Sequence, residues 1–511
     1  MLSPTNKSFN FLNGKSFNDN YLRILTLFAL VTLIFSVCLY FSTNATVADS
    51  DSGFEYTNAQ NVLQGKGLEH GPVVQQLLYA LILGIFGPDY RSILVFQNIL
   101  TTLLVLVTFR FIRRKINFSV AVIASLFFLL FPTFYWGNYS LKQYPLFLLF
   151  LMLAIYYFDR YMENKESRLM LFSAVFLGLA TMTHLLSLPF VGFVLLYYLC
   201  SKLRDNALTF NEVTKFYLIL LLTISPYLIW RIAVDGFSLD LLLTYPARWG
   251  TIKYGRIINI EFWRMPPTFT LEYYRRFLEL LVVWVFLPSL LLFLLFGIAK
   301  FKDKKLIFSW FLVLIAPYFV GRGVNSWVYT YPFMPLMVAL AAQGLHTFLK
   351  LHNSRKIEIL VIGIIIALSL TNFGYANTSF EQTMNRLAPG AQDAKEFNTM
   401  ITEGSNILFR SRQLSPLLPH KNVLQIQDLS EEDAISYLDW KSDEEVAKVF
   451  MKYDISYVIL YRNTRWEKDY YAWFGPVVGR EPSHFYKIQE SQYFEKVKEG
   501  SSYILYKFTK P

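Results

Sequence analysis

Long apolar runs separated by short polar loops dominate the chain from residue 21 to residue 375. A helix needs about 20 predominantly apolar residues to cross the hydrocarbon core of a bilayer. The pattern therefore predicts a polytopic α-helical membrane protein with about 11 transmembrane helices. The runs predicted to cross are residues 21–41, 92–112, 117–137, 144–160, 169–183, 187–201, 215–234, a stretch ending at 297, 306–321, 329–349 and 357–375.

The apolar run at residues 73–86 is predicted to lie in the membrane interface and not to cross. It is only about 15 residues long, where a perpendicular span needs about 20. If it crossed, the next span would carry the basic residues between positions 110 and 115 to the outer face. That placement conflicts with the tendency of Lys and Arg to stay on the cytoplasmic side.

Positive charges near the ends of the spans predict the orientation. Residues 1–20 form a polar tail with Lys7 and Lys15, and Arg23 lies at the start of the first span. These cations place the amino terminus in the cytoplasm. No small-residue cleavage site ends the first span, so we expect it to remain as an anchor. The predicted extracytoplasmic segments include the loops 43–91 and 236–276, the short loop 322–328 and residues 376–511.

Composition agrees with a membrane protein and argues against other classes. Hydrophobic residues make up 54% of the chain and aromatic residues 18%, with a mean hydropathy of +0.35, above the usual apolar share of soluble domains. Cys38 and Cys200 lie far apart in apolar runs, and the six histidines show no metal-ligand spacing, so no disulfide framework or metal site is expected. The net charge of +11 forms no continuous basic stripe, which argues against nucleic-acid binding.

The composition changes near residue 376 to that of a small soluble α/β domain. Ser442 and Glu445 form a capping-box pattern that predicts a helix to Lys452. Residues 455–461 predict a buried strand, and residues 406–410 and 503–508 are weaker strand candidates. No catalytic motif is present here, so we expect a domain for stability or for docking an acceptor.

The first outer loop, 43–91, concentrates candidate catalytic groups. Asp49, Asp51 and Glu55 fall within seven residues, and the following small and apolar positions predict a short amphipathic helix before a Gly-rich break at 65–67. Asp51 suits a general base, with an Asx-turn or helix cap as the alternative. For Asp49 the turn or cap is favoured, and Glu55 suits a first-turn helix acid or a partner of Arg.

The second outer loop, 236–276, is basic although it is predicted to lie outside. Its cations suit a polyprenyl-phosphate donor or an anionic acceptor, because arginine pairs bidentately with phosphate. Association with anionic lipid head groups explains the same charges, and the two interpretations stay open. The cations are Arg248, Lys253, Arg256, Arg264, Arg275 and Arg276.

The order of motifs in the first half resembles the GT-C glycosyltransferases. More narrowly, it is similar to the bacterial and archaeal group related to protein O-mannosyltransferases and to the aminoarabinose transferase of lipid A. Residues 178–183 and 331–335 extend the resemblance, which covers roughly residues 20–350. The residues that carry it after the first acidic segment are Tyr56, Ala59, Gly65, Gly67, His70, Pro72, Phe86, Gly87 and Arg91.

The resemblance implies an integral enzyme of the plasma (inner) membrane. It would transfer a sugar from a polyprenyl-phosphate donor to a lipid, glycan or protein acceptor on the extracytoplasmic face, with inversion and without a cofactor. Catalysis would fall to Asp51, with Asp49 and Glu55 as the other candidates. Donor or substrate contacts would fall to Tyr56, His70, Arg91, Arg322 and Tyr331. The charge of the second outer loop adds Arg256 and Arg264 as candidates for the donor phosphate.

This chain departs from the family pattern at three places. Asp51-Ser52 stands where members often have an Asp-Glu pair, which leaves the assignment of the acid open. Thr330-Tyr331 replaces a late Arg-Tyr pair and leaves Arg322 as the nearest basic candidate, while His184 stands where a basic residue often closes the fifth span.

A lipid or saccharide transporter or flippase is an alternative of a different class. Transporters place ionisable groups near the bilayer midplane, whereas the predicted spans carry almost none and the acids lie at the outer boundary. That difference favours the enzyme. A polysaccharide polymerase or ligase would share the outer site and differ in its donor.

Overall fold

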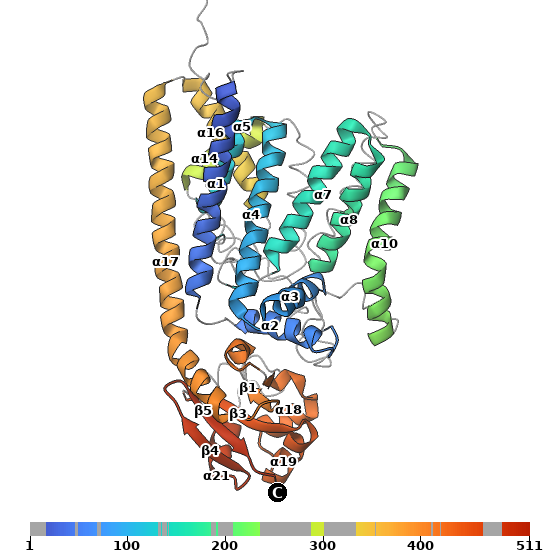
Figure 1. The fold of residues 1–511 in the computed structure, drawn as a ribbon, viewed down its shortest axis with the longest axis vertical. Helices are drawn as coiled ribbons and strands as arrows, with labels where there is room; N and C mark the ends of the chain where they lie inside the picture. Colours follow the sequence, from blue (N-terminus) through green and yellow to red (C-terminus); the bar gives the residue numbers. More distant parts are fainter. Residues whose placement is uncertain are drawn as a thin grey trace, which may run out of the picture.

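The computed structural model shows a helical bundle with a small α/β unit at one end (Figure 1). Helix α1 starts at the far end of the bundle, which is also where α17 begins. The structure describes residues 17–45, 50–68, 73–130, 134, 140–141, 143–184, 191–192, 208–235, 288–300, 334–352, 354–409, 412–419, 421–462 and 483–510.

The bundle helices coincide with the predicted apolar runs wherever both are described. Within those residues, five helices are long and apolar enough to cross a membrane, while α3, α5 and α8 are shorter. The predicted span 306–321 and nearly all of 187–201 lie outside the described residues, so the number of about 11 stays a prediction. The bundle helices are α1 (Phe17–Asn44), α4 (Tyr90–Lys115), α5 (Phe118–Phe127) with η1 (Phe128–Leu130), α7 (Tyr144–Asn164), α8 (Ser167–Thr183), α10 (Phe210–Asp235), α14 (Pro288–Lys300), α16 (Met334–His352) and α17 (Arg355–Met400).

Two short helices lie across the end of the bundle. Figure 1 shows α2 (Ser50–Leu63) and α3 (Val73–Phe86) running crosswise beneath α4, α7 and α8. Leu77, Leu81 and Ile85 are spaced four residues apart on α3 and are 48%, 57% and 62% exposed, which gives this helix an apolar outer stripe. An apolar stripe on a crosswise helix agrees with the prediction that residues 73–86 lie in the membrane interface.

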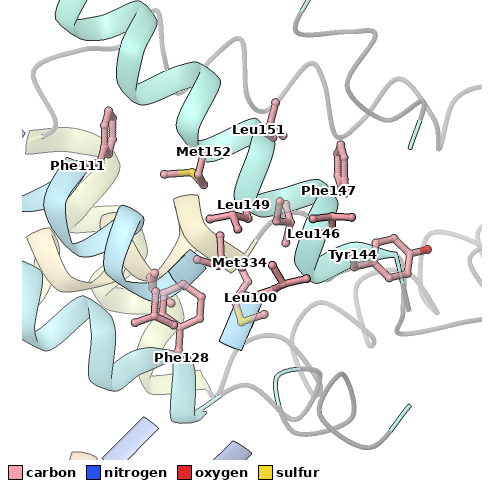
Figure 2. Close-up of a cluster of buried hydrophobic side chains, with 14 of the residues drawn as sticks. Leu100, Phe111, Phe128, Tyr144, Leu146, Phe147, Leu149, Leu151, Met152 and Met334 are labelled. Atoms are coloured by element: carbon pink, nitrogen blue, oxygen red, sulfur yellow. The ribbon is translucent and has the colours of Figure 1, made fainter. Parts of the chain in front are cut away.

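The core of the bundle is formed by interlocking side chains of α4, α5, α7 and α16. Figure 2 shows Leu146 and Leu149 of α7 gathered with Leu100 of α4, Phe128 of η1 and Met334 of α16, all of them buried. In lipid, close packing replaces the hydrophobic effect as the force between helices. Tight interlocking is therefore what holds these helices together.

Helices α14 and α16 approach each other at the level of their backbones. A Cβ atom added to Gly344 would lie 1.7 Å from the carbonyl oxygen of Phe293, and one added to Gly297 would lie 1.8 Å from that of Leu340. Only glycine permits this approach, because any larger residue would push the two helices apart.

The carboxyl-terminal unit contains a five-stranded sheet in the order β2-β1-β3-β5-β4. Strand β1 pairs in parallel with β2 and β3, whereas β5 is antiparallel to β3 and β4. Its elements are β1 (Asn406–Phe409), η5 (Arg412–Leu417), β2 (Asn422–Leu424), η6 (Ile426–Asp428), α18 (Glu431–Leu438), α19 (Asp443–Lys452), β3 (Ile455–Tyr461), α21 (Ser483–Glu490), β4 (Phe494–Glu499) and β5 (Tyr503–Phe508).

Both faces of this sheet are covered, which explains the continuous apolar run of β3. Tyr457 and Ile459 belong to the cluster that includes Phe397 of α17, and Val458 and Leu460 belong to the cluster beneath α18, α19 and α21. The predicted strands at 406–410, 455–461 and 503–508 are confirmed within one residue. The predicted helix is also confirmed, with the Ser442 side chain accepting a hydrogen bond from the amide of Glu445 at 3.2 Å.

Helix α17 differs from the expectation that a span ends near residue 375. It continues without interruption to Met400, a length of roughly 70 Å at 1.5 Å per residue. Ala376, Phe380 and Met384 are buried one turn apart against the bundle, and Ala394 and Phe397 are buried against the sheet. The expected boundary at 376 therefore falls inside a helix that serves both parts.

Candidate active site

Helix α2, which carries Asp51 and Glu55, is enclosed on almost every side. Between Ser52 and Ala59 only Phe54 keeps intermediate exposure, because α2 contacts α3 and also contacts η5 of the carboxyl-terminal unit. Asp51 lies in the first turn of α2, where the helix dipole stabilises a negative charge. A polar, acidic helix between apolar bundle helices and the carboxyl-terminal unit is the feature on which we build the site.

A chain of buried hydrogen bonds fixes α2 beside Asp51. The Ser52 hydroxyl accepts from the amide of Leu141 at 2.7 Å and lies 3.2 Å from the Ser140 hydroxyl. The Ser140 carbonyl accepts from Nε2 of Gln97 at 2.8 Å, and Oε1 of Gln97 accepts from the Tyr79 hydroxyl at 2.7 Å. The four side chains are at most 1% exposed, so α2, α3 and α4 and the residues 140–141 are locked together.

Glu55 is a buried carboxyl group in the same region. It is 6% exposed and lies near Tyr79. Burial raises the pKa of the Tyr79 hydroxyl well above its ordinary value, and the charge of Glu55 raises it further. Tyr79 therefore stays protonated and able to donate to Gln97. A buried acid inside a polar cluster at the end of an apolar helical bundle is a functional-site candidate.

Tyr56 fastens α2 to the turn between α3 and α4. It is fully buried, its hydroxyl donates to the carbonyl of Pro88 at 2.7 Å, and it accepts from Nε2 of Gln60 at 2.9 Å. Burial, followed by the charge of Asp89, raises the Tyr56 pKa. The structure gives Tyr56 this packing role, and its expected contact with a donor stays a prediction.

Arg91 is exposed in the first turn of α4. Its backbone amide donates to Oδ1 of the capping residue Asp89 at 3.0 Å, so the start of α4 is fixed at the same end of the bundle as α2 (Figure 1). The other predicted site residues, namely Asp49, His70, Arg256, Arg264, Arg322 and Tyr331, lie outside the described residues, as does the side chain of Asp51.

Gln97 and Asn98 are structural partners of the site that the sequence analysis missed. Nδ2 of Asn98 donates to the carbonyl of Cys38 at 3.1 Å and to the hydroxyl of Ser42 at 2.7 Å, which joins α1 to α4. Two adjacent amide side chains within an apolar span were the available signal, because buried polar residues in a membrane are retained for a specific partner. No sequence signal indicated that η5 reaches α2.

Part of the chain matches a known family of glycosyl-transferring membrane proteins. Residues 69–230 match the model of the dolichyl-phosphate-mannose-protein mannosyltransferase family. A comparison with curated protein sequences finds no match. The fold is similar to that of solved glycosyl-transferring membrane proteins over nearly the whole chain. The resemblance to GT-C glycosyltransferases that the sequence motifs indicated is confirmed.

Solved structures with this fold include ArnT from Cupriavidus metallidurans. Its apo form matches with a TM-score of 0.67 and 12% identity over 96% of this chain and 98% of that chain. Its form bound to undecaprenyl phosphate matches with a TM-score of 0.63 and 11% identity over 95% and 98%. Archaeoglobus fulgidus oligosaccharyltransferase AglB, in complex with an inhibitory peptide and a dolichol-phosphate, matches with a TM-score of 0.57 and 13% identity over 94% and 73%.

Proposed function

We propose that this chain is a membrane glycosyltransferase that moves a sugar from a polyprenyl-phosphate donor to a hydroxyl of a lipid, glycan or protein acceptor. The observation that carries the proposal is the acidic helix α2, enclosed between the GT-C bundle and the carboxyl-terminal unit. The ArnT structure bound to undecaprenyl phosphate supports the donor class. The reaction takes place at the extracytoplasmic face of the plasma (inner) membrane, opposite a cytoplasmic amino terminus.

In the proposed reaction Asp51 acts as the general base. The acceptor oxygen attacks the anomeric carbon and its proton passes to the Asp51 carboxylate, while the bond from that carbon to the phosphate oxygen breaks and polyprenyl phosphate leaves with the electron pair. Attack opposite the leaving group inverts the anomeric centre. A positioned base contributes about 10²- to 10⁴-fold to the rate. Asp49 and Glu55 are the alternative bases within the same segment.

Arginine side chains hold the departing phosphate in this proposal. Arg256, Arg264 and Arg322 are cations on predicted outer segments, where the distribution of charge in membrane proteins does not require them. Bidentate contact with a phosphate would oppose its growing negative charge as the bond breaks.

The test uses the full-length protein in lipid nanodiscs and follows loss of labelled sugar from a polyprenyl-phosphate donor. We expect Asp51→Asn to lower kcat by about 10²- to 10⁴-fold, because the amide keeps the shape of the carboxylate but cannot take the proton. Asp89→Asn is the matched control, because its amide oxygen can still accept from the amide of Arg91 and cap α4. Asp49→Asn and Glu55→Gln are measured in parallel.

Each outcome of this assay has a clear meaning. Collapse in Asp49→Asn or Glu55→Gln with normal rates in Asp51→Asn would keep the enzyme and move the base. Normal rates in all three variants would remove the reason for placing chemistry on this segment. In the same assay Arg256, Arg264 and Arg322 are each changed to Ala. The variant that lacks the phosphate contact should have a higher KM for the donor, and unchanged donor kinetics in all three would contradict the phosphate assignment.

A further inference from the structure

The segment η5 (Arg412–Leu417) joins the carboxyl-terminal unit to the helix that carries the candidate catalytic acids. It contacts α2, and it also contacts α17 and β2. Figure 1 shows the carboxyl-terminal unit directly beneath α2 and α3. Gln413, Leu414 and Ser415 are 9%, 1% and 4% exposed, so η5 is a packed layer and not a loose loop.

Gln413 attaches η5 to the sheet through two tyrosines. Its Nε2 donates to the hydroxyl of Tyr503 at 2.7 Å and to that of Tyr461 at 3.1 Å. The centroids of the two tyrosine rings are 5.1 Å apart, and both lie within 5.5 Å of the ring centroid of Phe409. Strands β1, β3 and β5 thus supply one aromatic platform, to which a single amide group fixes η5.

The platform is in turn fixed to the long helix α17. Asp393 of α17 accepts hydrogen bonds from the amides of Ser501, Ser502 and Tyr503 at 3.0, 2.7 and 3.0 Å. A Cβ atom on Gly390 would lie 2.4 Å from the ring of Tyr503, so helix and strand are in direct contact. Because α17 runs unbroken from the bundle, the position of η5 against α2 is set by a continuous structural path.

We propose that the carboxyl-terminal unit is an integral part of the transferase site, in which η5 holds α2 where Asp51 can act, and that Gln413 is the positioning residue of this contact. The inference rests on the proposed function. Loss of the Gln413 hydrogen bonds would let η5 and then α2 shift, and a displacement of about 1 Å at a reacting group can cost about 100-fold in rate. Donor binding among the spans would change little.

The test compares three variants of the full-length protein in lipid nanodiscs. Gln413→Leu fills a similar volume but lacks the N–H groups that bond to the two tyrosines. Gln413→Glu is the rescue variant. Burial raises the pKa of Tyr503, and the nearby Tyr461 raises it further. The Tyr503 hydroxyl therefore stays protonated and can donate to the new carboxylate. Gln489→Leu is the matched control on α21, where Gln489 donates to the carbonyl of Phe485 within its own helix, on the opposite side of the sheet.

Two readouts are combined, sugar transfer and hydrogen exchange of the α2 amides. We expect Gln413→Leu to lower kcat about 10- to 100-fold with the donor KM within about twofold of wild type, and to speed exchange in α2 about tenfold while α18 and α19 keep their protection. Gln413→Glu should restore most of both, and Gln489→Leu should match wild type.

The proposal is overturned if Gln413→Leu leaves kcat unchanged, or if exchange in α2 does not rise. A parallel loss of protection in α18 and α19 would also overturn it, because that result means general unfolding of the unit. Hydrogen exchange needs no substrate. If wild-type protein consumed no polyprenyl-phosphate donor, the proposed function would fail, whereas exchange in α2 would still decide whether η5 holds this helix.

Discussion

The carboxylate of Asp393 is predicted to be the main attachment between α17 and the β4–β5 turn. It is 5% exposed, and its Oδ1 accepts from the amide and the hydroxyl of Ser501 at 3.0 and 3.1 Å. Its Oδ2 accepts from the amides of Ser502 and Tyr503 at 2.7 and 3.0 Å. The substitution Asp393→Asn changes one carboxylate oxygen to an NH₂ group and removes the charge.

The free-energy cost of Asp393→Asn can be worked out from these four hydrogen bonds. The new NH₂ group is best placed toward Ser501, whose hydroxyl can turn to accept, so the Ser501 amide loses its acceptor at a cost of about 1–3 kcal/mol. The amides of Ser502 and Tyr503 keep an oxygen but exchange a charge-assisted bond for a neutral one, at about 1 kcal/mol each. The sum is about 3–5 kcal/mol, or roughly a 10²- to 10⁴-fold rise in local opening, since about 1.4 kcal/mol is a factor of ten.

Hydrogen exchange in lipid nanodiscs measures this opening directly. We expect protection of the Ser502 and Tyr503 amides to fall about 100-fold or more in Asp393→Asn. Gly500→Ala should give the same pattern, because its Cβ would lie 2.3 Å from Cγ of Asp393 and push the turn away. Asp454→Asn is the control, since that residue has a φ of 49°, which Asn tolerates well. Unchanged protection of Ser502 and Tyr503 in Asp393→Asn would refute the reasoning.

Two further predictions concern the bundle. Gly344→Ala should separate α14 from α16, because its Cβ meets the Phe293 carbonyl at 1.7 Å, and overpacking of this kind costs about 1–3 kcal/mol or more. Gly363→Ala, which meets nothing within 4 Å, is its control, and equal heat resistance of the two purified variants would contradict the packing argument. For topology, a reporter after Lys356 should register as cytoplasmic and one after Pro511 as extracytoplasmic; the same side for both would overturn the scheme.

The sequence alone determined the elements whose causes are local. The length of an apolar run predicted the bundle helices and the shorter helix α3 at residues 73–86, whose placement in the membrane interface stays a prediction. A continuous apolar run predicted β3 and a capping residue predicted α19, with bounds within one residue of those observed. These features depend on neighbouring residues, so they leave a pattern in the sequence that can be interpreted without a fold.

The candidate site was only partly accessible in this way. The acidic residues were identified and a short helix was predicted from the positions that follow them; α2 is present and includes Asp51 and Glu55. What holds the helix was not predicted: Ser52 is bonded to residues 88 and 89 positions later, and η5 approaches from more than 350 residues away. Sequence motifs gave Tyr56 a substrate role, whereas the fold shows its hydroxyl bonded to Pro88 and Gln60.

Only the tertiary structure decided how the helical bundle and the carboxyl-terminal unit are joined. A change of composition near residue 376 suggested a boundary, but α17 continues because its apolar positions first meet Phe41 of the bundle and then the sheet. Asp393 likewise accepts from donors more than 100 residues away. Such contacts join residues whose closeness exists only after folding, so no periodicity, charge run or cap in the sequence records them.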